Sequence, residues 1–354
     1  MKELAMLGHI VIGLLVGTLL SLAALVGVGY GAEAAYKFKT VDIPLHFTFL
    51  GQQRDDIVRL TDINNKGQMV GNNFAGDGFF VTKKHKVTEI RCPGDLSDNN
   101  STTVSAINNA EQVVGSCSDD QRNNAFVRDK KGNIVLLNYP GSDGTVAFGI
   151  NDLGQVVGQY WGFRFGEALQ RFHGFVWKDG TYTTIDSPFA EAMFTTLWGI
   201  NNAGQIIGTY LHHRPGSSDI NDYDSEVAFL YDNGKFTELD FPGAHIPFCC
   251  GAQTFPMDIN NLGQVVGSTY NSDGKLQFFL FDFGEYFKIT GLPENVVDYN
   301  GTWAINDESE IAGTYVESVP CETCGIEGEP GFSFIVHSFV ATPKKVGKKH
   351  EPVN

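Results

Sequence analysis

Short segments in which apolar and polar residues alternate run along the chain, and turn-forming residues separate them. One stretch predicts strands at 145–151, 155–160, 174–177 and 182–186, because alternation with a period of two is typical of a half-buried strand. Asn151-Asp152-Leu153-Gly154 and Lys178-Asp179-Gly180 are expected to be tight turns, since Asn, Asp and Gly tolerate positive φ. Four short antiparallel strands joined in this way form one blade of a β-propeller.

The phrase Ile-Asn-(Asn or Asp)-x-Gly-Gln-Val-Val-Gly recurs six times with small changes and marks the repeat. The copies begin at Ile63, Ile107, Ile150, Ile200, Ile259 and Ile305, so the spacings are 44, 43, 50, 59 and 46 residues. A period of about 40–50 residues with strand-like content is the signature of propeller blades. The sequence therefore predicts an all-β fold, a six-bladed β-propeller with four-stranded antiparallel blades.

The sixth repeat lacks a fourth strand, since little chain follows the third-strand segment 337–341. The matching phrase lies at the other end of the chain, in residues 37–44. We expect this N-terminal strand to complete the last blade and so to leave no open sheet edge between the first and last blades.

The order of these phrases resembles the HAF family of extracellular repeats, which is found in bacteria. The resemblance rests on IN(N/D)xGQVVGxY, on the A/G-F-(L/V)-W strand and on F-T-x-I-D-x-P-G, and it covers nearly all of residues 36–343. Glu111 and Ser309 depart from the pattern, because they replace the turn Gly. The resemblance implies export and a repeated β architecture, but it implies no activity.

The first 34 residues differ from the repeats and read as an export signal. Lys2 precedes an apolar run at 10–28, and Ala32-Glu33-Ala34 offers a small-x-small cleavage site. An uncleaved membrane anchor is the alternative, because the run approaches the length that spans a bilayer. The expected organisation is a signal at 1–34, a propeller at 35–343 and a basic tail at 344–354, in a secreted, periplasmic or cell-surface protein.

The charge of the chain limits its partners. With 41 acidic and 25 basic residues the formal net charge is −16, which argues against nucleic acid and anionic membranes. A membrane is expected as a partner only if the N-terminal segment stays uncleaved. The sequence contains no cofactor fingerprint, so we predict no cofactor, and we expect a monomer that binds an extracellular ligand or protein.

Six cysteines in an exported chain suggest disulfides. Cys92 and Cys117 fall at equivalent edges of the first two repeats, and we expect them to pair. The other four, Cys249, Cys250, Cys321 and Cys324, permit either two cross-links between loops or two local bridges.

The repeated Asn-(Asn or Asp)-x-Gly turns could be calcium loops, but each offers only one or two side-chain oxygens of the six or more required. The alternative is that Asn caps its own turn by accepting a backbone N–H two residues on, while Gly takes the left-handed position. The recurring Gln of the phrase is expected to satisfy backbone groups between blades.

Long and irregular connections should gather on one rim of the ring, because they follow the second strand of a blade or link successive blades. They span residues 161–173, 211–226 and 317–332, with further links at 94–101, 189–192, 243–253 and 294–301. Function is expected in these unrepeated segments rather than in the repeated scaffold.

Three kinds of function fit this rim. A ligand-binding surface for a sugar, a peptide or a protein is favoured, with candidate residues Trp161, Arg164, Arg171, His212, His213, Asp222 and Tyr223. A carbohydrate- or peptide-cleaving hydrolase or lyase is the alternative, with catalytic candidates Glu167, His173 and Asp222. A metal site built around His212, His213 and His245 lacks the usual ligand spacing, so no metal is predicted. A purely structural surface protein is the remaining possibility.

Overall fold

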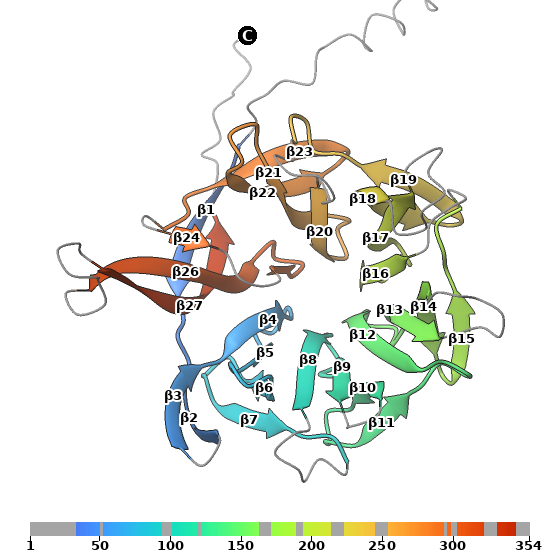
Figure 1. The fold of residues 1–354 in the computed structure, drawn as a ribbon, viewed down its shortest axis with the longest axis horizontal. Coiled ribbons are helices and arrows are strands. Elements are labelled where there is room, and N and C mark those ends of the chain that lie inside the picture. Colours follow the sequence, from blue (N-terminus) through green and yellow to red (C-terminus); the bar gives the residue numbers. More distant parts are fainter. Residues whose placement is uncertain are drawn as a thin grey trace, which may run out of the picture. The chain divides into compact units, whose positions relative to one another are not determined.

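The computed structural model describes residues 33–49, 52–93, 101–118, 122–162, 171–188, 194–213, 223–244, 254–293, 296–298, 303–321 and 331–344. Most of the predicted export segment and of the basic tail lies outside these ranges. All regular secondary structure within them is β-strand. The strands form sheets of mostly antiparallel strands around a common axis, which is the arrangement of a β-propeller (Figure 1).

Four sheets have four strands each and follow the chain in order. Their strands are β4 (Arg59–Ile63), β5 (Met69–Asn72), β6 (Gly78–Val81) and β7 (Val87–Ile90); β8 (Ser101–Ile107), β9 (Val113–Ser118), β10 (Asn123–Arg128) and β11 (Ile134–Leu137); β12 (Gly144–Ile150), β13 (Val156–Gly162), β14 (Arg171–Lys178) and β15 (Thr181–Thr184); and β16 (Thr195–Ile200), β17 (Ile206–His213), β18 (Tyr223–Asp232) and β19 (Lys235–Leu239). The strands predicted for the third repeat are confirmed to within a few residues.

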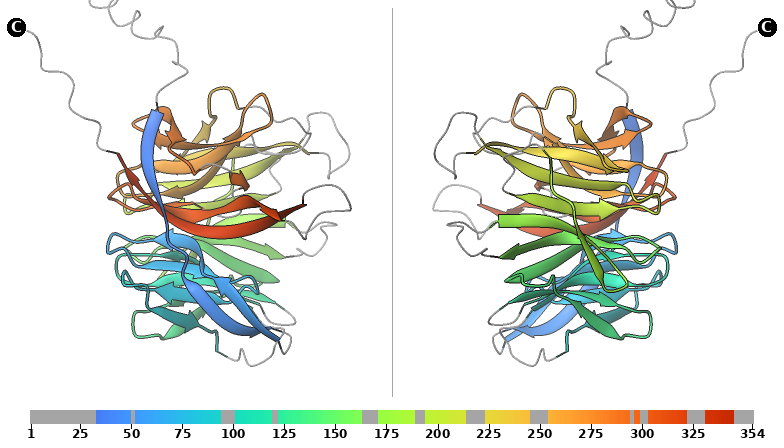
Figure 2. Two further views of the ribbon diagram at one scale, coloured as in Figure 1. Left: turned by 90° about the vertical axis from the view of Figure 1, so that its left-hand side faces the viewer. Right: turned by 90° about the vertical axis from the view of Figure 1, so that its right-hand side faces the viewer.

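A nine-stranded sheet holds the remaining repeats and both ends of the described chain. Its strands are β20 (Thr254–Ile259), β21 (Val265–Tyr270), β22 (Leu276–Asp282), β23 (Glu285–Thr290), β24 (Val296–Asp298), β25 (Ala304–Ile305), β26 (Ile311–Cys321), β27 (Gly331–Pro343) and β1 (Glu33–Thr40). Two runs of this sheet, β20 to β23 and β24 to β27, are joined through β1. In Figure 2 the strand β1 crosses the edge of the ring beside both runs.

The predicted pairing of the N-terminal strand with the C-terminal strand is confirmed. Residues 36–40 of β1 pair antiparallel with 339–343 of β27, and residues 33–35 pair parallel with 288–290 of β23. Asp42 then accepts hydrogen bonds from His337 Nδ1 (2.7 Å) and from the backbone N–H of Ser338 (2.9 Å). Asp186 receives the same two bonds, from His173 and Gly174, so residues 37–44 take the place of a fourth strand.

A hairpin of β2 (Pro44–Phe49) and β3 (Gln52–Ile57) follows β1 at the outside of the ring (Figure 1). It is a separate two-stranded sheet, and the sequence pattern did not predict it. The reason is that residues 44–57 lie outside the repeated phrases and have no second copy for comparison.

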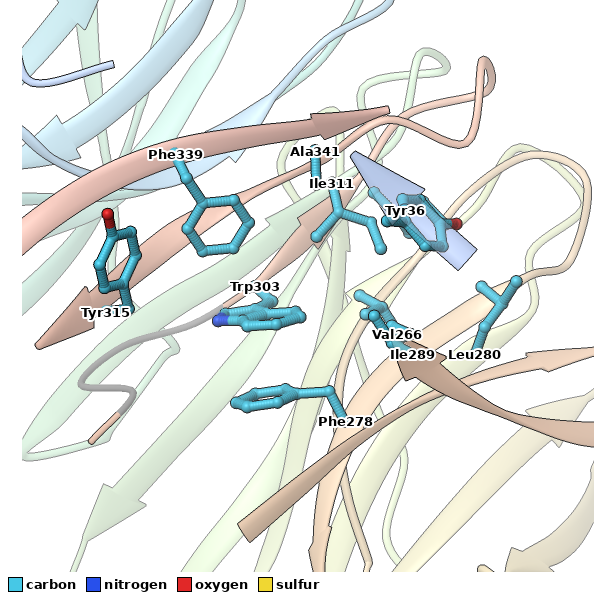
Figure 3. Close-up of a cluster of buried hydrophobic side chains, with 11 residues drawn as sticks. Tyr36, Val266, Phe278, Leu280, Ile289, Trp303, Ile311, Tyr315, Phe339 and Ala341 are labelled. Carbon is cyan, nitrogen blue, oxygen red and sulfur yellow. The ribbon is translucent and has the colours of Figure 1, made fainter. Parts of the chain in front are cut away.

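Buried apolar side chains fill the spaces between neighbouring sheets. Where the two runs of the nine-stranded sheet meet, Trp303 is fully buried and stacks on Phe278, with ring centroids 3.6 Å apart. Tyr36 of β1 and Phe339 of β27 complete this cluster, which Figure 3 shows with strands from both ends of the chain around it. The N-terminal strand is therefore part of the core.

The predicted disulfide between Cys92 and Cys117 is confirmed. It ties the segment after β7 to strand β9 of the next sheet, with Cα atoms 6.1 Å apart. Cys249, Cys250 and Cys324 lie outside the described residues, and only the backbone of Cys321 lies within them, at the end of β26.

Candidate functional site

The innermost strand of five sheets carries a β-bulge at the same place, three residues before the repeated Asn. In each strand the pairing register shifts across one residue, which is left without a partner opposite it. Such bulges turn a side chain out of the regular ladder. The bulged residues are Thr61, Ser105, Phe148, Trp198 and Met257, and Trp303 occupies the same position in the sixth repeat.

These six residues line one pocket on the propeller axis, with a cavity volume of about 310 Å³. We call it the axial pocket. One side is apolar, because it carries the partly exposed side chains of Phe148, Trp198 and Met257. Trp303 lies beside them, but its ring is fully buried in the core. The other side carries the hydroxyls of Thr61 and Ser105. The repeated strand frame thus presents unrepeated side chains.

Trp198 and Phe148 form a fixed aromatic corner in this wall. Their ring centroids lie 4.6 Å apart with a tilt of 45°. The indole Nε1–H of Trp198 donates to Thr209 Oγ1 (3.1 Å), which holds the orientation of the ring. Gly149 lies against the backbone of Trp198, since an added Cβ would come within 2.9 Å of the Trp198 carbonyl oxygen. This close approach requires glycine.

Two carboxyl groups, Asp62 and Asp258, enter the axial pocket from the position just before the repeated Ile. Asp62 accepts from the N–H of Ile63 through Oδ1 and from that of Ile107 in the next sheet through Oδ2, both at 2.6 Å. Asp258 does the same with Ile259 (2.8 Å) and with Ile305 (2.7 Å). Each carboxyl therefore bridges two sheets while facing the pocket.

Burial makes both groups harder to ionise. It raises the pKa of Asp62 well above its usual range, and the charge of Asp258 adds to the increase. Burial also raises the pKa of Asp258 to about 7, against the lowering effect of its two backbone hydrogen bonds. Two carboxyl groups with shifted pKa values in one cavity are a recognised mark of a functional site, although structural pairs can show it too.

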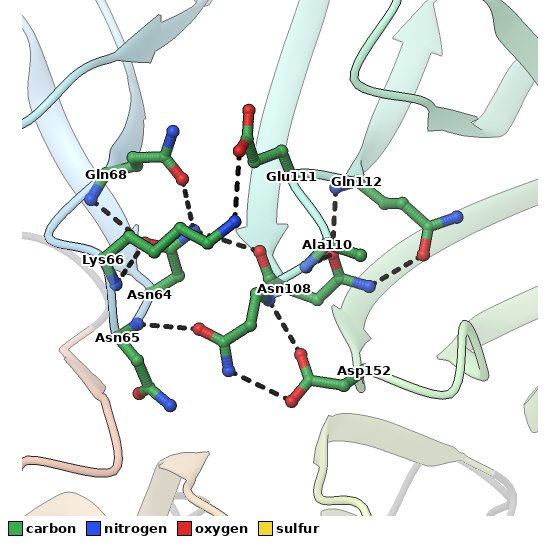
Figure 4. Close-up of polar contacts among 10 residues, drawn as sticks. Asn64, Asn65, Lys66, Gln68, Asn108, Ala110, Glu111, Gln112 and Asp152 are labelled. Atoms are coloured by element: carbon green, nitrogen blue, oxygen red, sulfur yellow. Dashed lines mark hydrogen bonds and ion pairs between the residues drawn. The ribbon is translucent and has the colours of Figure 1, made fainter.

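Two closed circuits of hydrogen bonds, made by the repeated turns, surround the turn end of the axial pocket. In the first, the side-chain amide of each repeated Asn donates to the backbone oxygen of the equivalent Asn in the next repeat, and the circuit runs through Asn64, Asn108, Asn151, Asn201, Asn260 and Asn306. Figure 4 shows the part between the first two repeats.

The second circuit uses the following residue of each turn. Its backbone N–H donates to the side-chain oxygen of its counterpart at 2.7–2.9 Å, through Asn65, Asn109, Asp152, Asn202, Asn261 and Asp307. Each Asp lies between two Asn residues and accepts an amide N–H from both. These amide bonds lower the pKa of Asp152 against the effect of burial.

The turns themselves are built as the capping interpretation predicts. Asn151 Oδ1 accepts the N–H of Leu153 two residues on and that of Gln155 four residues on. Gly154 has φ +72°, and Glu111 and Ser309 take the same left-handed conformation in its place. Within the described residues, no group of three or more His, Cys, Asp or Glu side chains is placed to hold a metal.

The prediction for the repeated Gln is wrong in its detail. The side-chain oxygen of Gln155 accepts from Asn151 in its own turn (2.8 Å), and it is Asn151 that reaches the backbone of the next repeat. The side-chain amide of Asn151 has two N–H groups, and it donates one to Gln155 and the other to the backbone oxygen of Asn201. Gln155 therefore orients the Asn that links the two sheets.

The structure describes two of the predicted rim side chains. Trp161 lies near the end of β13, and its ring is 5.5 Å from that of Phe172. His173 lies in β14, bonded to Asp186 and 5.1 Å from the ring of Tyr160. Tyr315, His337 and Asp42 repeat this arrangement elsewhere in the ring, which favours a structural role for His173.

Backbone positions alone are described for four further candidates. Arg171 begins β14, and the backbones of His212 and His213 lie in β17 and that of Tyr223 in β18, where His213 and Tyr223 are paired across the strands. Arg164, Glu167 and Asp222 lie outside the described residues.

Sequence reasoning missed Asp62, Asp258 and the bulged residues because they lie inside the repeat. A signal was present: the residue before the repeated Ile is Asp in two copies and otherwise Ala or Gly, at 106, 149, 199 and 304. The preceding residue varies still more. Aligning the six repeats and comparing them position by position would have identified the residues of the pocket wall.

No known sequence family matches this chain, and no curated protein sequence matches it either. Solved β-propellers resemble its structure. A catalytically inactive virginiamycin B lyase from Staphylococcus aureus with quinupristin has a TM-score of 0.45 and 12% identity, over 87% of this chain and 99% of that one. The β-propeller domain of the Trilobed protease from Pyrococcus furiosus has a TM-score of 0.45 and 10% identity, over 86% of this chain and 96% of that one. A gluconolactonase from Xanthomonas campestris has a TM-score of 0.44 and 12% identity, over 89% of this chain and 99% of that one. The likeness concerns architecture. Among the described residues no helix could cross a membrane.

Proposed function

We propose that this protein is an exported, six-bladed β-propeller that binds a small extracellular ligand in its axial pocket. The count of six follows if β25, β26, β27 and β1 are one blade of the nine-stranded sheet and β20 to β23 another. Both turn circuits pass through six repeats, in support of this count. Export is supported by the N-terminal segment and by the Cys92–Cys117 disulfide.

The bulges carry the proposal. A scaffold needs the same packing at every repeat, and the turns meet that need with nearly identical residues. At the five bulges, however, the residues are Thr, Ser, Phe, Trp and Met, and the equivalent residue of the sixth repeat is Trp303. A pocket of about 310 Å³ with an apolar side and a polar side is at the small end of the range for ligand sites.

The predicted rim keeps a role as the entrance. The innermost strands run toward the turn circuits, so the other end of the axial pocket lies where these strands begin. We propose that Trp161, which is paired with Gly144 at the start of β12, borders the entrance and adds to selectivity.

Filling the pocket tests the proposal. Ser105→Phe would place a ring in the cavity, whereas Ser272→Phe makes the same change in an exposed turn. Both proteins and the wild type would be screened by thermal shift against sugars, amines and short peptides. We expect compounds that raise the melting temperature of wild type and Ser272→Phe but not of Ser105→Phe. Equal stabilisation of Ser105→Phe by every active compound would contradict binding in the axial pocket.

A hydrolase or lyase is the second candidate, because Asp62 and Asp258 place two carboxyl groups with raised pKa values in one cavity. One could donate a proton while the other accepts one. Catalysis would require that a bound compound be converted, and that Asp258→Asn abolish turnover while retaining binding. If the ligand is recovered unchanged after prolonged incubation, the enzymatic candidate is contradicted and binding is the only function supported.

A further inference from the structure

We infer that the ligand of the axial pocket is a small organic cation, held by the carboxylates of Asp62 and Asp258 and by the aromatic corner of Phe148 and Trp198. This inference rests on the proposed function and specifies its ligand class.

The first argument is charge. The described residues that line the axial pocket include four carboxyl groups and no Lys, Arg or His, the carboxyls being those of Asp62, Asp152, Asp258 and Asp307. Asp152 and Asp307 each accept side-chain amide bonds from two Asn neighbours. The bonds found for Asp62 and Asp258 come from backbone N–H groups. Buried carboxylates are normally stabilised by a cation, and an anionic ligand is excluded by the same four groups.

The second argument is the aromatic wall. A cation is attracted to the face of an aromatic ring, most strongly that of Trp, and cages of such rings recognise ammonium groups. Trp198 uses its N–H edge on Thr209, and its partly exposed ring lines the cavity beside Phe148. The backbone next to Trp198 passes close to the acid, because a Cβ on Gly199 would lie 3.4 Å from Asp258 Oδ1. Asp258 and the aromatic corner line the same pocket, so one ligand could contact both.

A neutral sugar fits less well, because it needs several fixed polar partners. On the polar side Asn72 is already committed, since its side chain donates to the backbone oxygen of Val104 and accepts from its N–H. The hydroxyl of Thr61 is committed too, because it donates to the backbone oxygens of Val70 and Val104. That leaves chiefly the hydroxyl of Ser105. A neutral ligand would also bring no counter-charge to the carboxyl groups, and the net charge of −16 draws cations rather than neutral molecules.

Cation binding should be linked to proton release. The charged groups that line the pocket with Asp258 are Asp62, Asp152 and Asp307, and all are acidic. Burial keeps Asp258 partly protonated near neutral pH, so a proton competes with the cation for the same carboxylate. Affinity should rise with pH between about 5 and 8 and then level off.

Calorimetry on the full chain tests the inference. The probes are tetramethylammonium, choline, butylammonium and guanidinium, together with the neutral isostere of choline in which a tert-butyl group replaces trimethylammonium. We expect at least one cation to bind, choline to bind about tenfold more tightly than its isostere, and heats in two buffers of different ionisation enthalpy to reveal released protons.

Variants separate charge from shape. Asp258→Asn and Asp62→Asn should each weaken the cation about tenfold and leave the isostere unchanged, whereas Trp198→Leu should weaken the cation without altering its pH dependence. Asp179→Asn, the same chemical change in an exposed turn, is the matched control. If one Asp variant fails to fold, the other and Trp198→Leu retain the test.

Two results would overturn the inference. One is equal affinity for choline and its isostere; the other is failure of all four cations to bind at millimolar concentration. In either case a neutral compound that stabilises the wild type but not Ser105→Phe would still support the proposed function, so the two ideas fail separately.

Discussion

The backbone N–H of Asp307 donates to the side-chain oxygen of Asn65 at 2.8 Å, although 242 residues separate them. This bond joins the last repeated turn to the first. The ring is therefore closed at its centre by turn side chains, as well as at its edge by strand β1. Since the two closures use different residues, they can be weakened separately.

The inner closure should depend on each repeated Asn. In Asn151→Ala the N–H groups of Leu153 and Gln155 lose their acceptor, and the backbone oxygen of Asn201 loses its donor. Because Asn151 is buried, we expect a loss of about 2–4 kcal/mol in the free energy of unfolding. Urea denaturation would measure it. Asn133→Ala, in an exposed hairpin, should cost less than about 1 kcal/mol, and equal costs would refute a special role for the circuit.

The disulfide should contribute strongly, since it joins two sheets. Its 25-residue separation predicts about 3–4 kcal/mol of stabilisation by restriction of the unfolded chain. Urea midpoints with and without reductant would measure this for the wild type. In the double variant Cys92→Ser, Cys117→Ser the midpoint should already be low and reductant should not change it further. A wild type insensitive to reductant after complete reduction would contradict the prediction.

The architecture was predictable from sequence because its cause is periodic. Six copies of one phrase identified the strands, the turns and even the displaced fourth strand, since Val41-Asp42-Ile43-Pro44 has the same Asp-x-Pro pattern as Ile185-Asp186-Ser187-Pro188. The hairpin β2–β3 has no second copy, so no comparison could predict it.

The axial pocket was not predictable in the same way, because its wall is assembled from residues 43–59 positions apart that share only their place in the repeat. A bulge decides that Trp198 faces the axis, and bulges have no reliable signature in a single strand. Asp62 and Asp258 gain their chemistry from burial and from each other, which requires the closed ring. Sequence reasoning looked for function in the long connections and so passed over the strands.

Titration of Asp258 should lower the free energy of unfolding as pH rises. A carboxylate whose pKa is lowered by folding has the opposite effect. The pKa of Asp258 is raised to about 7 in the folded protein, from about 4 when unfolded. Its stabilising effect is therefore complete below about pH 4, declines as pH rises toward 7 and changes little above that. Comparison of the wild type with Asp258→Asn, by urea denaturation across this range, isolates the effect. The variant is expected to be less stable at low pH, because Asn replaces one of two acceptors with a donor, and the gap should narrow as pH rises. A gap that widens with pH would mean that Asp258 is ionised in the folded protein throughout.

The outer closure should depend on Tyr36. This side chain is 2% exposed and packs in the cluster that includes Phe278, Trp303 and Phe339, so it joins β1 to both runs of the nine-stranded sheet. Tyr36→Ala leaves a cavity there and should lower the free energy of unfolding by about 3–5 kcal/mol. Lys37→Ala, on the exposed face of the same strand, should change it by less than about 0.5 kcal/mol. Hydrogen exchange adds a local measurement: in Tyr36→Ala the amides of β27 that pair with β1 should lose protection before those of β9 and β10, which belong to a separate sheet. If β27 and β10 lose protection together, the ring unfolds as one cooperative unit. In that case β1 stabilises the whole ring rather than one edge of it.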